Sequence, residues 1–209
     1  MDSEYNQLVN LLGGPQGQIN NNQVVLCKCG IGKVNAALGC TDFIAQHAPD
    51  CIVSTGVAGG IDSSLQVMDL VAASQTVYHD VWCGPGNAVG QVQGLPERFA
   101  AAPRLLQAAL RISSGATVRQ GLICTGDQFI TNHQELAVIK SKFPEGLAVD
   151  MESAAIAHTC HLRNVPFLSL RIISDTPGAA PDHWQQYTNF WAELGTRAFQ
   201  AIASFLHQL

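Results

Sequence analysis

The chain has 209 residues and a mass of 22.3 kDa, which is enough for one α/β domain with a sizeable core and too short for two. Hydrophobic residues make up 47% and charged residues only 13%, so the composition excludes a disordered chain and favours a buried sheet. The net charge of -5 and the absence of any run of Lys or Arg argue against a surface that binds nucleic acid or anionic membrane.

Residues 1–14 have neither a basic region nor a long apolar stretch, so they do not predict a signal peptide. No apolar run reaches the ~20 residues that a membrane-spanning helix needs. The seven cysteines are odd in number, form no CxxC pair and lie mostly among apolar residues. This usage is typical of reduced thiols in a cytoplasmic protein and does not favour disulfides or a metal site.

Apolar, β-branched segments alternate with helical patterns along the chain. Strands are predicted over residues 23–29, 51–55, 69–79, 118–125, 147–149 and 165–174. Helices are predicted over residues 33–47, 103–112, 132–143 and 151–163, and an apolar stripe over 187–209 predicts one long closing helix. The alternation predicts a single α/β domain, residues 1–209, with a mixed, mostly parallel central sheet flanked by helices.

Four motifs fall where predicted strands lead into loops, which is the edge of a parallel sheet at which ligands bind. They span residues 30–33, 54–60, 150–152 and 172–175. The first two are rich in glycine but match neither the dinucleotide-binding fingerprint nor the phosphate-binding P-loop. Their glycines serve either the backbone conformation or the approach of a ligand, and spacing alone leaves both interpretations open.

Two carboxylates in these motifs each have two interpretations. Glu152 either complements the dipole of the helix that follows it, with Asp150 as N-cap, or binds sugar hydroxyls from a partly desolvated position. Asp175 is either a turn former or an acid with a raised pKa that can protonate a departing purine. The residue patterns alone do not choose between these interpretations.

Taken in order, the motifs resemble those of the nucleoside phosphorylase/nucleosidase superfamily. Within it, the chain is most similar to the 5′-methylthioadenosine/S-adenosylhomocysteine nucleosidases. The matching segments are residues 30–37 (GIGKVNAA), 54–60 (STGVAGG), 78–80 (YHD), 125–130 (TGDQFI), 148–153 (AVDMES) and 173–175 (ISD). The resemblance runs from about residue 1 to the last helix. It implies a nucleoside phosphorylase-like fold, a homodimer, and hydrolysis of the bond between adenine and ribose without metal or organic cofactor.

The resemblance also implies a role for each matching residue. Asp175 protonates N7 of adenine, Glu152 holds the ribose hydroxyls and stabilises positive charge on the sugar, and Glu4 activates the attacking water. Met151 packs beneath the ribose, Phe129 stacks on the purine, and the backbone of Ile130 reads its Watson–Crick edge. The remaining residues that the resemblance places at the substrate are Ile31, Val57, Ala58 and Gly59, with Arg171 and Ser174 in support.

The assignment of Glu4 rests on the pattern Met-x-x-Glu at residues 1–4, which follows the first strand in the family. This chain begins at the last residue of that strand, so we expect unpaired backbone groups on the strand's neighbours. The sequence leaves open whether the start was assigned late or the form is shortened. Asp150 is a second departure, because the family usually has Glu there. Trp184 and Tyr187 compete as the aromatic cap of the pocket, and the preferred 5′-substituent is not determined.

Two alternative functions remain. Purine nucleoside phosphorylases resemble this chain but place an arginine just before the glycine loop to bind phosphate, and residues 53–56 contain none. A catalytically impaired nucleoside-binding homologue is the second alternative. The apolar segment over residues 81–96, which contains Trp and Gly, favours a homodimer because it is too hydrophobic for a free loop.

Overall fold

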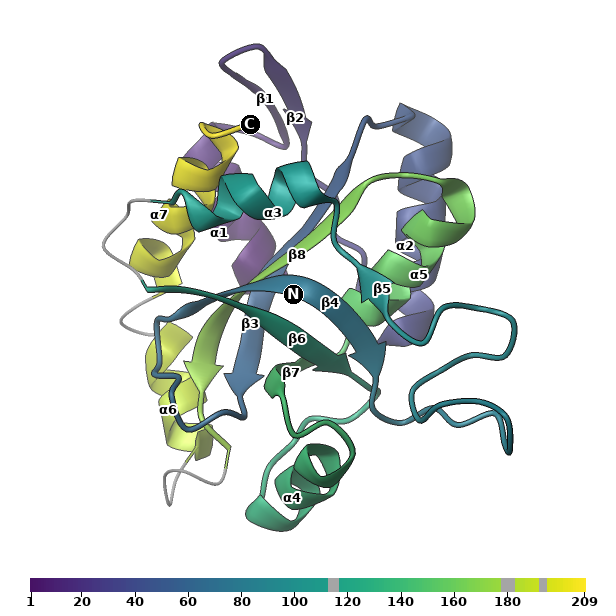
Figure 1. Ribbon diagram of the computed structural model, residues 1–209. Coiled ribbons are helices and arrows are strands. Elements are labelled where there is room, and N and C mark those ends of the chain that lie inside the picture. The colour runs from purple at the N-terminus through teal and green to yellow at the C-terminus, as the bar shows by residue number, and fades with distance from the viewer. Residues whose placement is uncertain (113–116, 178–182, 192–194) are drawn as a thin grey trace.

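The computed structural model describes residues 1–112, 117–177, 183–191 and 195–209 (Figure 1). Within them, six strands form the central sheet in the order β5 (Phe99–Ala100), β4 (Leu70–Tyr78), β6 (Val118–Thr125), β7 (Gly146–Asp150), β3 (Ile52–Gly60) and β8 (Phe167–Asp175). β4 also pairs with β8, so the sheet curls until its two sides meet. The long pairs β3–β8, β4–β6 and β6–β7 are parallel and hold most of the paired residues, and the three short pairs are antiparallel, which confirms the predicted mixed, mostly parallel sheet.

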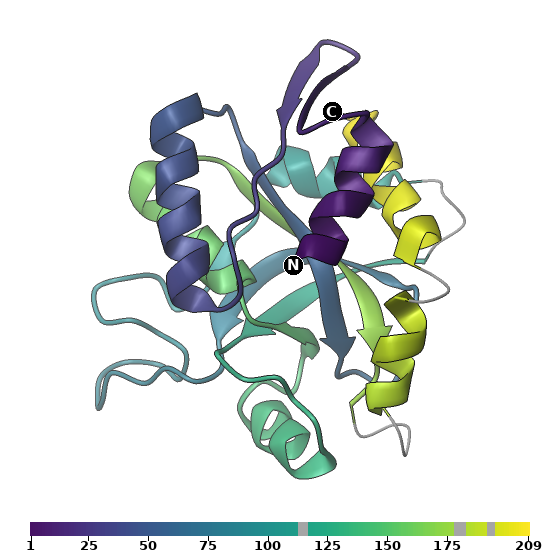
Figure 2. The ribbon, with the colours of Figure 1, turned by 180° about the vertical axis from the view of Figure 1, so that it is seen from behind.

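Helices cover the sheet from both sides. α2 (Lys33–His47) packs on α5 (Ser153–Arg163), and α1 (Asp2–Leu12) packs on α7 (Gly195–Leu206) on the opposite side of the molecule (Figures 1 and 2). α3 (Pro103–Leu110) packs on β4, β6 and β8, α6 (His183–Asn189) packs on β8, and α4 (His133–Lys142) connects β6 to β7. This arrangement confirms the α/β fold class.

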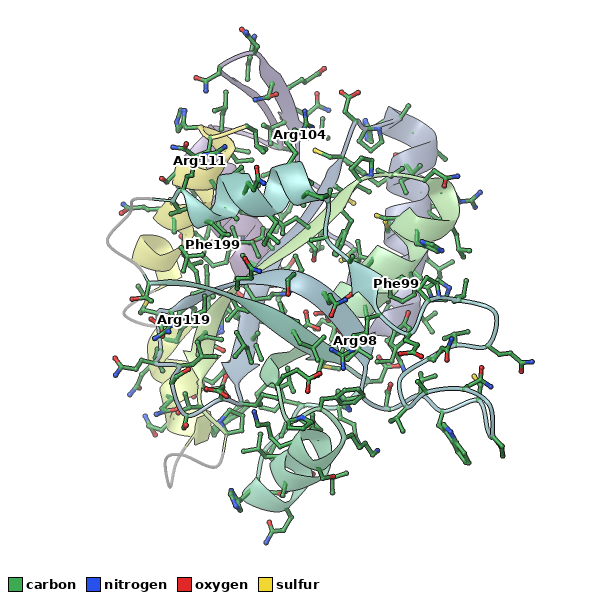
Figure 3. All side chains as sticks on the ribbon, in the orientation of Figure 1. Arg98, Phe99, Arg104, Arg111, Arg119 and Phe199 are labelled. Atoms are coloured by element: carbon green, nitrogen blue, oxygen red, sulfur yellow. The ribbon has the colours of Figure 1, made fainter. Side chains whose placement is uncertain are left out.

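The core follows the apolar segments of the sequence. All nine residues of β8 are buried, as expected for a strand covered on both faces. Phe199 of α7, fully buried, packs in the same cluster as Leu105 of α3 and Leu170 of β8, and points inward from its helix (Figure 3). The seven cysteines are free thiols, of which Cys40, Cys124 and Cys160 are buried. Among the described residues no helix is long and apolar enough to cross a membrane.

Several element predictions differ from the structure. The strand predicted over residues 23–29 ends early, because β2 (Asn22–Val25) forms a separate hairpin with β1 (Gln16–Ile19) through a turn at Asn20, whose φ is 52°. The sequence did not predict α1. Where a closing helix is predicted from residue 187, helical structure already begins at residue 183 with α6, and α7 ends at Leu206; residues 192–194 lie outside the described residues.

β3 has one open edge. The Ile52 N–H points to the β8 side, where it donates to the Pro166 carbonyl, and the two strands pair in parallel as far as Gly59. On the other edge, the described residues place a partner strand only at Gly59 and Gly60, which pair with β7. Because backbone groups alternate in direction along a strand, those of Val53, Thr55 and Val57 point to the open edge. The Val57 N–H on this edge donates to Glu4 Oε1, and among the described residues no strand pairs with Val53 or Thr55, as expected.

Candidate active site

One cavity of about 940 Å³ collects every residue that the sequence analysis placed at the site. Its lining includes Glu4, Ile31, Val57, Ala58, Gly59, Phe129, Ile130, Met151, Glu152, Arg171, Ser174 and Asp175. These residues come from α1, from the carboxyl ends of β3, β7 and β8, and from the loops that precede α2 and follow β6. The structure thus brings together segments that are up to 171 residues apart, from Glu4 to Asp175.

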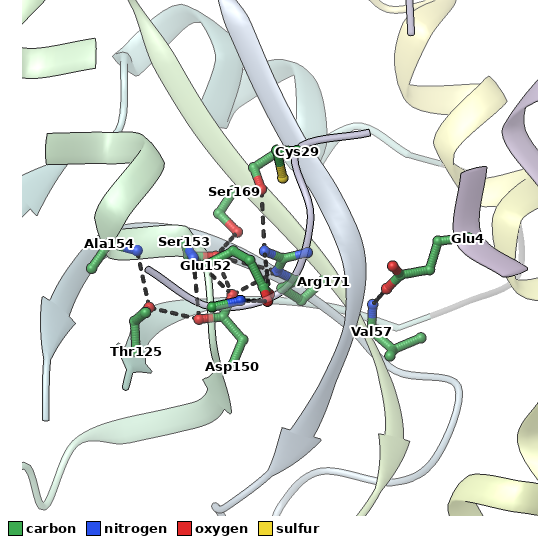
Figure 4. Close-up of polar contacts among 12 residues, drawn as sticks. Glu4, Cys29, Val57, Thr125, Asp150, Glu152, Ser153, Ala154, Ser169 and Arg171 are labelled. Atoms are coloured by element: carbon green, nitrogen blue, oxygen red, sulfur yellow. Dashed lines mark hydrogen bonds and ion pairs between the residues drawn. The ribbon is translucent and has the colours of Figure 1, made fainter. Parts of the chain in front are cut away.

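Glu4 reaches the cavity from the first turn of α1. Its Oε1 accepts the Val57 N–H at 3.0 Å (Figure 4). Its other oxygen forms an ion pair with the amino group of Met1. The side chain is 17% exposed, so the carboxylate is partly desolvated but remains accessible from the cavity. Glu4 therefore occupies one hydrogen-bonding position on the open edge of β3.

Gly56 allows two charged side chains to approach β3. A Cβ atom at this position would lie 2.5 Å from Arg171 Nη1 and 2.5 Å from Glu4 Oε1, closer than side-chain atoms can be. At Gly56 the absence of a side chain thus serves close packing of the protein's own side chains against the backbone, which is a structural reason and not the approach of a ligand.

Glu152 lies at the N-terminus of α5, where it is the N-cap residue; the helix begins at Ser153 and not at residue 151 as predicted. Its Oε1 accepts the Gly32 N–H at 3.0 Å, and its Oε2 lies 3.9 Å from Arg171 Nη2. Burial raises the pKa of the Glu152 carboxyl; Arg171 opposes this shift, and the nearby charge of Asp150 reinforces it. Glu152 is thus a partly desolvated carboxylate that faces the cavity.

Asp175 ends β8 and is 3% exposed. The Ser174 hydroxyl donates to its Oδ1 at 2.7 Å, and both residues line the cavity. Asp175 is the last residue of β8, Glu152 comes shortly after β7, and both strands border the carboxyl end of β3. The arrangement places a buried acid and a second carboxylate around one cavity, which suits acid-assisted cleavage of a glycosidic bond.

A buried polar network beneath Glu152 was largely missed by sequence reasoning. Arg171 Nε donates to Asp150 Oδ2 at 2.8 Å, and Arg171 Nη2 donates to Ser54 Oγ at 3.1 Å (Figure 4). Asp150 also accepts from the Thr125 hydroxyl at 2.6 Å and from the Ser153 N–H at 3.2 Å. The signal in the sequence was the presence of polar residues inside otherwise apolar strands. Within the described parts of the chain, no cluster of three His, Cys, Asp or Glu is arranged to hold a metal ion.

Three aromatic residues, Phe129, Trp184 and Tyr187, cluster where α6 meets the loop after β6. Phe129 meets Tyr187 edge-on, with ring centroids 5.5 Å apart, and Tyr187 stacks on Trp184 at 5.7 Å. Tyr187 lines the cavity and its hydroxyl donates to Met1 Sδ at 3.4 Å, whereas Trp184 is 60% exposed and does not belong to the lining. Of the two candidates for the aromatic cap, Tyr187 is the one at the cavity.

The cavity continues beyond Glu4, Glu152 and Asp175 along the open edge of β3. Residues 23–31 line one side of this extension, and residues 51–57 line the other. Leu8 of α1 and Ile202 and Leu206 of α7 also contribute apolar side chains. The extension is the space that a strand beside β3 would fill.

The chain matches the family model of the phosphorylase superfamily over residues 15–207. It is 45% identical over 163 residues to the 5′-methylthioadenosine/S-adenosylhomocysteine nucleosidase of Actinobacillus succinogenes, covering 77% of this chain and 71% of that protein.

Solved structures are similar over the whole chain. The corresponding nucleosidase of Neisseria meningitidis, in complex with methylthio-immucillin-A, is 35% identical with a TM-score of 0.92, covering 100% of this chain and 96% of that one. The enzyme of Colwellia psychrerythraea, in complex with adenine, is 34% identical with a TM-score of 0.90, covering 100% of this chain and 92% of that one.

Proposed function

This chain belongs to the phosphorylase superfamily and, within it, to the family of 5′-methylthioadenosine/S-adenosylhomocysteine nucleosidases, and we propose that it hydrolyses the N-glycosidic bond of these two nucleosides. The products are adenine and the corresponding thioribose, and 5′-deoxyadenosine is a further expected substrate. The observation that carries the proposal is the convergence of Glu4, Glu152 and Asp175 on one cavity.

Asp175 is the general acid in this proposal. Departure of adenine leaves an electron pair on the base, and a proton delivered to N7 stabilises it. The buried position of Asp175 at the end of β8 favours a carboxyl that can carry this proton, and the hydrogen bond from Ser174 fixes its orientation. Phe129 and the backbone of Ile130 hold the base against this acid.

Glu152 and Glu4 act on the sugar side. Positive charge builds on the ribose as the base leaves, and the Glu152 carboxylate stabilises it while accepting hydrogen bonds from the ribose hydroxyls. Met151 packs beneath the ribose from the same loop. Glu4, whose carboxylate is held in place by the Val57 N–H, accepts the proton of the attacking water.

Water rather than phosphate is the proposed nucleophile. Residues 53–56 carry no arginine, and Arg171, which lines the cavity, is already engaged by Asp150, Ser54 and Glu152. The test is adenine release from methylthioadenosine, S-adenosylhomocysteine, adenosine and inosine, with and without phosphate. The expected result is phosphate-independent release from the first two. Dependence on phosphate would reassign the chain as a phosphorylase, and adenine binding without turnover would mark it as an impaired homologue.

The chain is also proposed to act as a homodimer through the outer face of α2. Val34 and Leu38, four residues apart on α2, are 69% and 60% exposed, and Ile31 in the loop before the helix is 50% exposed. Trp82 and Val89, in the loop that projects beyond β4 in Figure 1, add further exposed apolar surface. Sedimentation of the wild type and of Leu38→Glu tests this: the expected masses are a dimer and a monomer. A monomeric wild type at micromolar concentration would refute it.

We further propose that the reaction takes place in the cytoplasm, in the salvage of methionine from spent 5′-thioadenosines. Support comes from the seven free thiols, which suit a reducing compartment. Fractionation of cells that produce the protein, followed by assay of adenine release in each fraction, tests the location. Activity confined to an extracytoplasmic fraction would exclude it.

A further inference from the structure

A cluster of three charged residues, Lys33, Asp80 and Asp127, lies beside the cavity and joins three segments of the chain. Lys33 begins α2, Asp80 follows β4, and Asp127 lies in the loop after β6. The Lys33 ammonium donates to Asp80 Oδ2 at 2.7 Å and lies 3.8 Å from Asp127 Oδ2. The Asp127 N–H donates to the same oxygen of Asp80 at 3.0 Å. All three residues lie outside the set of described residues that line the cavity.

Two successive backbone amides at the start of α2 donate hydrogen bonds to two different carboxylates, those of Glu152 and Asp127. The Gly32 N–H donates to Glu152 Oε1 at 3.0 Å, and the next amide, that of Lys33, donates to Asp127 Oδ1 at 2.7 Å. Gly32 has a φ of +84°, and a Cβ there would lie 2.9 Å from Asp127 Oδ1. Because the N-terminus of a helix carries partial positive charge, it favours both carboxylates. Two neighbouring peptide groups thereby hold Glu152, the carboxylate assigned to the ribose, and Asp127, in the loop after β6.

The loop after β6 carries the residues assigned to the base. Its first residue, Gly126, donates its N–H to the Asp150 carbonyl at 3.0 Å. Asp127, next in the chain, is held by Lys33 and Asp80, and Phe129 and Ile130 then enter the cavity. The position of the base pocket therefore depends on the contacts of Asp127.

Lys33 supplies the positive charge between two carboxylates. Although burial favours protonation of Asp80, the hydrogen bonds from Lys33 and Asp127 and the charge of Lys33 hold the pKa of the Asp80 carboxyl below its usual range. Without the ammonium, Asp80 and Asp127 would face each other as like charges, and the loop that carries Phe129 would move away from Asp80.

We propose that Lys33 is a positioning residue that fixes the adenine-binding loop, residues 126–130, relative to Glu152. The inference rests on the proposed nucleosidase function, since it takes the base and ribose assignments from there. A displaced loop weakens contacts to the base that are the same in the ground state and the transition state. The loss is therefore expected in KM and in adenine affinity more than in kcat.

The test compares Lys33→Met, Lys33→Arg and, as a matched control, Lys142→Met, an exposed lysine at the end of α4. Lys33→Met is expected to raise KM for methylthioadenosine and the Kd for adenine by roughly 10- to 100-fold, the scale of a misplaced binding group, with kcat within about 3-fold of wild type. Lys33→Arg keeps the charge and should recover most of the affinity, and Lys142→Met should match wild type.

The outcomes separate the two proposals. An unchanged KM and adenine Kd in Lys33→Met would overturn the positioning role. Equal losses in kcat and affinity, together with a lowered melting temperature that Lys33→Arg does not restore, would overturn it as well. If wild type binds adenine but does not hydrolyse methylthioadenosine, the proposed function fails, and the adenine Kd series still decides the role of Lys33.

Discussion

Arg171 Nε and Asp150 Oδ2 lie 2.8 Å apart with side chains only 4% and 1% exposed, so the floor of the cavity is a buried ion pair. Asp150 belongs to β7 and Arg171 to β8, so the pair joins these two strands. The Glu152 carboxylate lies 3.9 Å from the same guanidinium. Removing one partner of a buried ion pair destabilises the folded protein much more than removing one partner of an exposed pair.

Asp150→Asn is therefore expected to lower the free energy of unfolding by roughly 3–5 kcal/mol, because the Arg171 charge loses its closest counterion in a desolvated position. Urea unfolding followed by circular dichroism measures the change. Asp2→Asn is the matched control, since Asp2 pairs with Lys28 at 2.5 Å but is 79% exposed, and its unfolding midpoint should not move. Equal midpoints for both variants would contradict the importance of burial.

Asp175→Asn should keep the shape of the side chain and remove the transferable proton. The expected loss in kcat for methylthioadenosine is about 10²- to 10⁴-fold, the usual contribution of general acid catalysis. Adenine affinity and melting temperature should stay near wild type, because the amide oxygen can still accept from Ser174. A variant that retains more than a third of wild-type kcat would remove Asp175 from the role of acid.

Glu152→Gln tests the raised pKa of this carboxyl. The ionised form is the active one in the proposed mechanism, so kcat of the wild type should fall as the pH drops through that raised pKa. Glu152→Gln should have a low kcat without this acid limb, whereas Glu145→Gln, at a half-exposed ion pair with Arg98, should retain it. An acid limb that persists in Glu152→Gln would assign the titration to another group.

The same shift has a consequence for stability. A carboxyl whose pKa is raised on folding binds its proton more tightly in the folded state, so its contribution to stability is present below the unfolded pKa and is lost as the pH rises through the folded pKa. Ionised Glu152 therefore destabilises the fold at neutral pH. Glu152→Gln is expected to melt at a higher temperature than wild type at pH 7, and a lower one would contradict this sign.

The open edge of β3 predicts that an extended apolar segment placed directly ahead of Met1 will stabilise the fold. Such a segment can pair with the backbone of Val53 and Thr55 and fill the cavity extension, while the Val57 N–H stays on Glu4. It also converts the Met1 ammonium to an amide, which frees Glu4 from its ion pair, so kcat should rise.

Differential scanning calorimetry measures the effect on stability. For a chain of this size, each kcal/mol gained should raise the melting temperature by about 2–4 °C. The matched control has the same length with proline at alternate positions, which removes the N–H donors, and it should melt like the chain that starts at Met1. Identical melting curves for both extensions would mean that the edge does not accept a strand.

Much of the fold could be read from local patterns. Helix α2 has the predicted bounds, 33–47, because glycines precede it and the apolar pattern ends at His47. The strands around β4, β6 and β8 were found from their apolar runs. α1 was missed, although its apolar residues Tyr5, Leu8 and Leu12 follow helical spacing. The residues to which the resemblance assigned a role in catalysis or substrate binding all line one cavity.

The sequence by itself determined which residue types stand at the ends of the strands: the glycine loops, the carboxylates Glu152 and Asp175, and the polar residues within apolar strands. Only the tertiary structure decided which of these meet. The contact of Glu4 with Val57, the ion pair of Arg171 with Asp150 and the cluster around Lys33 join segments 21 to 94 residues apart. The reason is physical: periodicity is local to an element, whereas partners across a sheet are selected by strand pairing and by the need to satisfy buried polar groups.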